Sequence, residues 1–233
     1  MLIFDIGCNK GEYTQSWLRR DPECHIVCVD ANHNFNFSYE IISRAQTRIS
    51  FVNKLVTATS EGTKDFFIDY EQTGISTASR EFMKESRFAK GSKNLPPNSG
   101  GWVPTPIQVK TTTLDELIKE HGHPDIIKID VEGHEYEVVS GLSQKVDMLH
   151  FEWHEEMFED VEKSVQHLKK IGFKEFHISG HFEEGNVFEK LNYDNNGDTY
   201  NYEPKDFYSW EDITTEDFIQ PSRRINYGML FAR

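Results

Sequence analysis

Short apolar runs alternate with amphipathic stretches along most of the chain. Runs of Ile, Val, Leu and Phe that are too short for helices predict buried parallel strands, and the longer stretches between them have helical periodicity. The predicted strands cover residues 2–5, 25–30, 49–52, 125–130 and 147–152. The predicted helices cover residues 12–20, 37–45, 114–121, 133–142 and 156–171. Strands that alternate with helices favour an α/β fold with a doubly wound, mostly parallel sheet and right-handed crossovers.

The rest of the chain adds strands and two insertions. Residues 63–69 predict one more strand, and residues 173–178 and 227–232 predict two final strands. Only a loop connects the last two, so we expect an antiparallel pair at the end of the sheet. We interpret residues 84–106 and 180–225, which are rich in polar and turn-forming residues, as insertions in a single domain that spans residues 1–233.

Length and charge narrow the class of protein. A chain of 233 residues suits one domain, and its formal net charge of −14 disfavours nucleic acid or an anionic membrane as partner. No stretch is apolar enough to span a bilayer, and Asp5 follows the short apolar start too closely for a signal peptide. The three cysteines (Cys8, Cys24 and Cys28) lack zinc or redox spacing, which fits a reducing compartment. We therefore expect a cytoplasmic location.

Acidic residues end several of the predicted strands. In a doubly wound sheet, ligands bind beyond the carboxyl ends of the strands, at the point where the strand order reverses. Four strand ends carry acids, namely Asp5, Asp30, Asp130 and Glu152. Their convergence at one edge of the sheet predicts a binding site there.

The first strand leads into a glycine-containing turn, D-I-G-C-N-K-G at residues 5–11. A dinucleotide fingerprint would need a glycine where Asn9 stands, and Asp5 would repel a pyrophosphate. An acid suits a cationic nucleoside ligand instead, and S-adenosylmethionine carries both a sulfonium and an amino group. Asp30, at the end of the second strand, is placed to accept hydrogen bonds from ribose hydroxyls. The candidate cofactor-binding residues are Asp5, Gly7, Asn9, Gly11, Asp30 and Asn32.

Two segments resemble the FkbM-type methyltransferase family. The T-L-D helix start at residues 113–115 and the K-I-D-V-E-G-H-E strand end at residues 128–135 are similar to the family hallmark K-I-D-V-E-G-x-E. Residues 5–14 resemble its D-I-G-x-N-x-G-x-Y-T motif. The resemblance implies a Rossmann-like class I methyltransferase fold, S-adenosylmethionine as donor and a hydroxyl acceptor on a sugar or polyketide-type molecule. The second strand departs from the pattern, since Asp30-Ala31-Asn32 stands where Glu-Pro is commoner.

Methyl transfer to an alcohol also needs a destination for the hydroxyl proton, either a base or a metal. Asp130 and Glu132 have i, i+2 spacing, and Glu152 and His154 repeat it on the next predicted strand. These four are the candidate catalytic residues. In one interpretation His154 is the general base. In another, Asp130, Glu152 and a neighbour hold Mg²⁺ through oxygen ligands, and Glu132 and His134 could also simply cap the following helix.

The acceptor side depends on the two insertions. Residues 180–225 combine tyrosines, phenylalanine and tryptophan with acids and asparagines, a composition expected of a carbohydrate-facing lid. The same rings could instead pack on the sheet edge. Three alternatives stay open: a nicotinamide-dependent enzyme, a non-catalytic binding module and an N-methyltransferase. Because the first strand begins at about residue 2, the chain is also consistent with a domain of a larger glycan-modifying protein.

Overall fold

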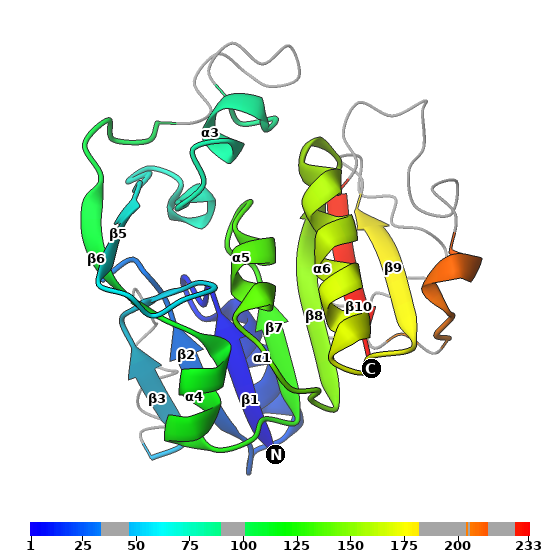
Figure 1. Cartoon of the computed structure of the whole chain (residues 1–233). Coiled ribbons are helices and arrows are strands. Elements are labelled where there is room, and N and C mark those ends of the chain that lie inside the picture. The colour runs from blue at the N-terminus through cyan, green and yellow to red at the C-terminus, as the bar shows by residue number, and fades with distance from the viewer. Residues whose placement is uncertain (34–46, 90–100, 182–203, 205, 214–226) are drawn as a thin grey trace.

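A seven-stranded sheet forms the centre of the computed structural model, which describes residues 1–33, 47–89, 101–181, 204, 206–213 and 227–233 (Figure 1). The strand order is β3-β2-β1-β7-β8-β10-β9. The strands are β1 (Leu2–Ile6), β2 (His25–Val29), β3 (Ile49–Val52), β7 (Ile126–Ile129), β8 (Met148–His154), β9 (Phe176–His181) and β10 (Tyr227–Ala232). Pairs from β3 to β8 are parallel, whereas β10 pairs antiparallel with both β8 and β9. This confirms the predicted α/β fold with a doubly wound, mostly parallel sheet and an antiparallel terminal strand pair.

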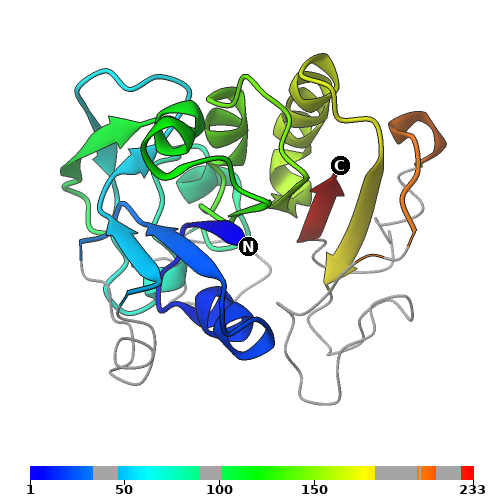
Figure 2. The same cartoon turned by 90° about the horizontal axis from the view of Figure 1, so that it is seen from below.

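Helices cover both faces of the sheet (Figure 2). Helix α1 (Glu12–Arg20) covers one face, and α4 (Leu114–His121), α5 (Glu135–Ser140) and α6 (Phe158–Lys170) cover the other. The bounds of α1 and α4 coincide with the predicted helices, and the predicted cap is present because the Thr113 side chain accepts a hydrogen bond from the Glu116 N–H. The helix predicted over residues 37–45 lies outside the described residues.

Helix α5 begins two residues later than the sequence predicts. Glu132 and Gly133 have φ angles of 56° and 82°, so both adopt the left-handed region and cannot belong to a right-handed helix. The chain therefore leaves β7 through a tight turn before α5 begins at Glu135.

A second, three-stranded sheet extends beyond the end of β3. It consists of β4 (Leu55–Val56), β6 (Ile107–Thr112) and β5 (Thr63–Phe66), in that order. No sequence pattern predicted β4 or β6, and β5 ends at Phe66, three residues before the end of the predicted strand. Between β5 and β6, the 3₁₀ helix η1 (Thr73–Ile75) and the short helix α3 (Phe82–Glu85) lie above the carboxyl ends of the main strands (Figure 1).

The described residues also include the 3₁₀ helices η2 (Glu155–Met157) and η4 (Trp210–Asp212). Much of the two insertions, residues 90–100, 182–203, 205 and 214–226, lies outside the described residues, so the acceptor-side lid stays a prediction. No helix in the described part of the chain has both the length and the apolar character required to cross a bilayer.

Candidate active site

A cavity of about 280 Å³ opens at the carboxyl ends of β1, β2, β7 and β8. This is the point where the strand order reverses between β1 and β7, and the volume is close to the lower end for small-molecule sites. Two groups of residues line it. The first group comes from the glycine-containing turn, the start of α1 and the residue after β2, and includes Gly7, Asn9, Tyr13 and Asp30. The second comes from the ends of β7 and β8, and includes Lys128, Asp130, Glu132 and Glu152.

The turn after β1 requires glycine at one position for steric reasons. Gly7 has φ 74° and its N–H donates to the Val29 carbonyl at 2.8 Å. A Cβ at this position would lie 1.8 Å from the Asp130 carbonyl oxygen, so no other residue fits without moving β7. Asn9 also has a left-handed φ of 41°, and Gly11 caps α1 with φ 79° but does not line the cavity.

Asp30 lines the cavity and is fixed by two backbone groups. Its carboxylate accepts hydrogen bonds from the Asn9 and Asn32 N–H groups, each at 2.8 Å. Burial raises the pKa of Asp30, although both N–H donors oppose the shift. Each carboxylate oxygen has a second lone pair, so the group can still accept from a vicinal diol. Asn32 contributes to this arrangement through its backbone N–H, which donates to the Asp30 carboxylate.

Asp5 lies beneath the turn rather than in the cavity wall. It is fully buried, accepts a hydrogen bond from Thr14 Oγ1 at 2.7 Å and has Lys128 Nζ at 3.3 Å. Lys128 Nζ also donates to the Gly7 carbonyl at 2.9 Å and lies 3.4 Å from Asp130 Oδ2. Lys128 therefore joins the two groups of lining residues. The sequence analysis assigned it no role, although a lysine inside the apolar run of β7 must be paired when buried.

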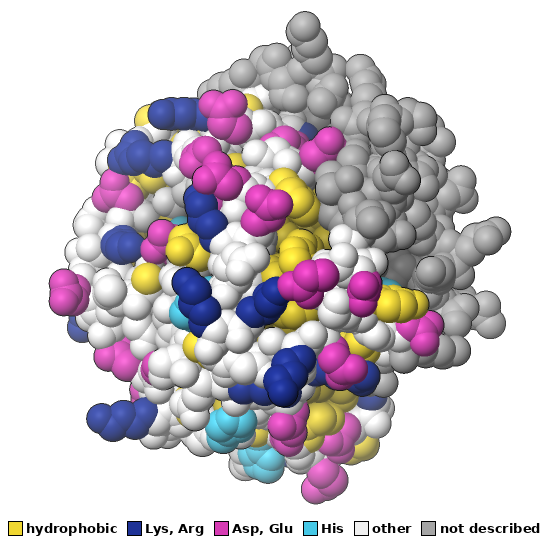
Figure 3. All heavy atoms as spheres, turned by 45° about the vertical axis from the view of Figure 1, so that its right-hand side comes forward, with side chains coloured by type: hydrophobic (Ala, Val, Ile, Leu, Met, Phe, Trp, Pro, Cys, Tyr) yellow, Lys and Arg dark blue, Asp and Glu magenta, His cyan; other side chains and the backbone are white. Residues whose placement is uncertain are grey.

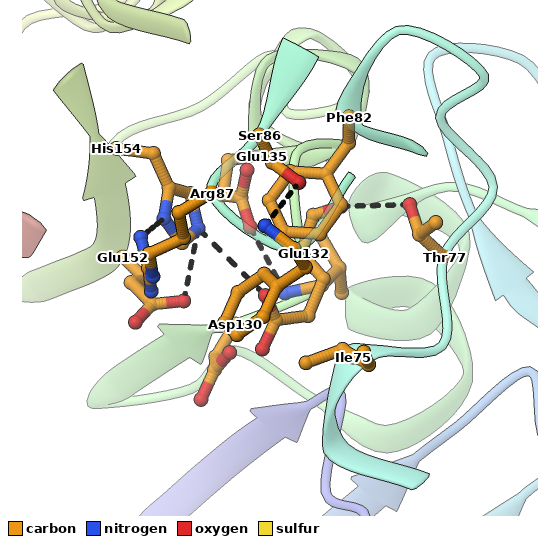
Figure 4. Close-up of polar contacts among 12 residues, drawn as sticks. Ile75, Thr77, Phe82, Ser86, Arg87, Asp130, Glu132, Glu135, Glu152 and His154 are labelled. Atoms are coloured by element: carbon orange, nitrogen blue, oxygen red, sulfur yellow. Dashed lines mark hydrogen bonds and ion pairs between the residues drawn. The ribbon is translucent and has the colours of Figure 1, made fainter. Parts of the chain in front are cut away.

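Three of the four predicted catalytic residues, Asp130, Glu132 and Glu152, line the cavity, and His154 lies next to Glu152 without lining it (Figure 4). His154 Nε2 lies 3.1 Å from Glu152 Oε2 and 3.9 Å from Glu132 Oε2. Within the described residues, the ligand atoms of Glu132, Glu152 and His154 lie within 4.8 Å of one another, a composition that can hold a cation. Asp130, which the sequence analysis paired with Glu152 as a magnesium ligand, is not in this group and contacts Lys128 instead.

Burial of several carboxyl groups changes their acidity. Burial raises the pKa of Asp130 to about 6, with Lys128 lowering it and Glu152 raising it. Burial, Glu152 and Asp130 together raise the pKa of Glu132 well above its usual value. Burial likewise raises the pKa of Glu135 to about 7. For His154, burial and Arg87 lower the pKa whereas Glu152 and Glu135 raise it, and the pKa is raised overall. These groups can therefore hold or release protons near neutral pH.

Residues 5–177 match the FkbM methyltransferase domain. The chain belongs to the FkbM methyltransferase family. Family membership implies S-adenosylmethionine as methyl donor. Among solved structures, the precorrin-6y C5,15-methyltransferase of Geobacter metallireducens GS-15 is similar at 9% identity and a TM-score of 0.45, covering 100% of this chain and 80% of that one. No curated protein sequence matches the chain.

In this family member, the turn that carries Glu132 is held by residues that come before β6. Thr77 Oγ1 donates to the Glu132 carbonyl at 2.7 Å, which stabilises the left-handed backbone at Glu132 (Figure 4). Phe82 packs on Gly133 so closely that a Cβ at Gly133 would lie 2.6 Å from its side chain. Glu135 accepts a hydrogen bond from the Val131 N–H at 3.0 Å.

His134, unlike Glu132, lies outside the cavity, at the start of α5. It is the N-cap residue of α5, but its side chain makes no capping hydrogen bond. It is buried, and burial lowers its pKa to about 4, so the ring is neutral. It does not line the cavity that contains Glu132.

Arg87 is a site residue that the sequence analysis missed. Its Nη1 lies 2.8 Å from His154 Nδ1, and its backbone N–H donates to Glu156 Oε1 at 2.8 Å. The guanidinium stacks over the rings of Tyr227 at 4.2 Å and Phe88 at 4.5 Å. Arg87 belongs to the segment interpreted as an insertion, and no spacing in the sequence relates it to β8.

Proposed function

We propose that this chain is an S-adenosylmethionine-dependent O-methyltransferase whose acceptor is a hydroxyl group of a sugar, a glycan or a similar small molecule. One observation carries the proposal. A single cavity is lined by Asp30 and the glycine-containing turn together with Asp130, Glu132 and Glu152. The first group suits a nucleoside, and the second suits removal of a hydroxyl proton.

The residues of the first group, Asp30 and the glycine-containing turn, fit the donor. Asp30 would accept hydrogen bonds from the ribose hydroxyls, and Gly7 and Asn9 of the turn line the same cavity. The carboxylates beyond Lys128 favour a ligand with positive charge and would repel phosphate. When bound, the donor supplies a methyl group already activated by the positive charge on its sulfur.

The chain's contribution to the reaction is positioning and proton removal. Alignment of the acceptor oxygen with the methyl group can lower the barrier by several kcal/mol, since it replaces an encounter with a held geometry. A neutral hydroxyl becomes a useful nucleophile when a neighbouring group accepts its proton. Asp130 at the end of β7, with a pKa of about 6, and Glu152 on β8 both line the cavity and can provide that group.

Charge and composition support a small neutral acceptor. On the face shown in Figure 3, Lys and Arg side chains are scattered among Asp and Glu and form no basic patch. Together with the net charge of −14, this argues against a nucleic acid or an anionic membrane as partner. The aromatic and acidic residues of 180–225 favour a carbohydrate, and the three free cysteines favour the cytoplasm.

Two measurements test the proposal. Calorimetric titration should show micromolar binding of S-adenosylhomocysteine and no binding of NAD. Incubation with S-adenosylmethionine labelled on the methyl carbon, with and without Mg²⁺, should then yield a methyl ether on a member of a sugar and glycan panel. Donor binding without turnover on any acceptor would favour the binding module, and a methylated amine product would favour N-methyl transfer. Binding of NAD alone would contradict the proposal.

A further inference from the structure

The loop that follows β5 forms part of the cavity wall. Residues 67–77, here called the 67–77 loop, are closed at the base by two backbone hydrogen bonds between Phe67 and Thr77, at 2.8 and 3.0 Å. We propose that this loop holds the bound methyl donor against the glycine-containing turn, with Asp69 and Thr73 as positioning residues. The inference rests on the proposed function and adds two residues to its donor site.

The middle of the 67–77 loop lies against the glycine-containing turn. The residues of the loop that line the cavity are Thr73, Gly74 and Ser76. Thr73 Oγ1 donates to Asn9 Oδ1 at 2.9 Å, and a Cβ on Gly74 would lie 3.5 Å from Asn9 Nδ2. The Asn9 N–H donates in turn to the Asp30 carboxylate at 2.8 Å. Thr73 is therefore linked through Asn9 to the carboxylate that we propose to bind the ribose.

Asp69 is a buried carboxylate that fixes the shape of the loop. It is 1% exposed, and its Oδ1 accepts hydrogen bonds from the Glu71 and Gln72 N–H groups, each at 2.9 Å. Its Oδ2 accepts from the Gly101 N–H at 2.7 Å. One oxygen therefore holds the residues just before η1, and the other ties the loop to the segment that leads into β6. Hydrogen bonds to a charged acceptor are stronger than neutral ones, so these three contacts restrict the loop.

Residues 101–103 support the loop at two further points. The Val103 N–H donates to the Ile68 carbonyl at 2.9 Å, and Trp102 Nε1 donates to the Ile75 carbonyl at 2.7 Å. The side chains of Trp102 and Ile75 are buried in the same apolar cluster. The loop is therefore held by backbone, carboxylate and apolar contacts before any ligand binds.

The end of the loop contacts the second group of lining residues. Thr77 Oγ1 donates to the Glu132 carbonyl at 2.7 Å (Figure 4). One short loop thus connects Asn9 with the backbone of Glu132 and lines the cavity between these contacts. A wall that is already ordered reduces the entropy lost when a ligand binds, which increases affinity. Loosening the loop lowers the population of the binding-competent state, and the apparent Kd rises by the same factor.

Replacing Thr73 by valine removes the hydroxyl that donates to Asn9 and keeps the size of the side chain. The loss of one neutral hydrogen bond should raise the Kd of S-adenosylhomocysteine by roughly 2–10-fold in calorimetric titration. Thr73→Ser keeps the hydroxyl and should bind like the wild type. The matched control is Thr63→Val, because Thr63 Oγ1 also donates to an amide oxygen, Oε1 of Gln108 at 3.1 Å, but outside the cavity.

Asp69→Asn tests the buried carboxylate without changing its size. An amide has one acceptor oxygen, so its NH₂ group must face a backbone N–H on the other side, where neither can accept. The Kd of S-adenosylhomocysteine should rise by roughly 10-fold or more, since the lost hydrogen bonds involve a charged group. Each titration is made at a temperature at which circular dichroism shows the variant to be folded. A purely structural role of Asp69 would lower Tm and leave this Kd unchanged.

Hydrogen exchange follows the loop directly in the wild-type protein. The Glu71 and Gln72 amides donate to Asp69, so they exchange only when the loop opens. Saturating S-adenosylhomocysteine should slow their exchange several-fold, because the bound ligand favours the closed loop. Unchanged exchange of these amides overturns the inference, as does a wild-type Kd in both Thr73→Val and Asp69→Asn.

The outcomes separate this inference from the proposed function. A raised Kd in the variants without methylation of any hydroxyl supports the inference and contradicts the proposed acceptor. Methylation of a hydroxyl together with an unchanged Kd in the variants contradicts the inference alone. A wild-type protein that does not bind S-adenosylhomocysteine contradicts both. If Asp69→Asn does not fold, the comparison of Thr73→Val with Thr73→Ser decides.

Discussion

Replacing Lys128 by methionine should destabilise the fold by about 3–5 kcal/mol, the usual consequence of leaving a buried charge without its partner. Asp5 is fully buried and would lose the ammonium that now lies 3.3 Å away, retaining the hydroxyl of Thr14. The Gly7 carbonyl would also lose its donor at 2.9 Å. For a chain of this size, each kcal/mol lowers Tm by about 2–4 °C, so the expected decrease is about 6–20 °C.

Urea unfolding at neutral pH, followed by circular dichroism, measures the change directly. The matched control is Lys163→Met, because Lys163 is exposed on α6 and its pairs with Glu159 and Asp160 lie in solvent. This control should unfold like the wild type. The double variant with Asp5→Asn should recover part of the loss, since it removes the unpaired charge. A loss of under about 1 kcal/mol in Lys128→Met, the value of a surface pair, would refute the reasoning.

Three further outcomes are expected. Gly133→Ala should lower stability by about 1–2 kcal/mol through its left-handed φ, and more through the clash with Phe82, and differential scanning calorimetry measures both together. An unchanged Tm would contradict this. In the native state the pKa of Glu135 is about 7, above its unfolded value, so this group stabilises the fold at low pH and the contribution is lost as pH rises towards 7. Glu135→Gln should therefore gain stability relative to wild type between about pH 4.5 and 7, by up to about 3 kcal/mol, and a flat difference in urea titrations would exclude the shift. Asp30→Ala should raise the Kd of S-adenosylhomocysteine by about 10–100-fold, because it removes hydrogen bonds to a charged acceptor, and calorimetry that shows an unchanged Kd would remove Asp30 from the donor site.

The sequence predicted the fold because its strands are local and strongly patterned. The runs at β1, β2 and β7 are largely apolar and buried, as parallel strands covered by helices must be. The acids that follow them were predicted to converge, and those on β7 and β8 do, since parallel neighbours end at the same edge. By contrast, β4 has two residues and β6 carries polar positions, so neither shows a clear period and both depend on pairing with distant segments.

What the sequence by itself determined is therefore the architecture and the set of acidic residues at one edge of the sheet. Only the tertiary structure decided the role of each, because burial and contacts from distant segments set it. Asp5 was predicted to contact the ligand, yet it lies beneath the turn and pairs with Lys128, 123 residues along the chain. His154, a candidate base, has Arg87 Nη1 at 2.8 Å from its Nδ1, although Arg87 lies 67 residues away along the chain. Such contacts carry no local period, so spacing in the sequence does not reveal them.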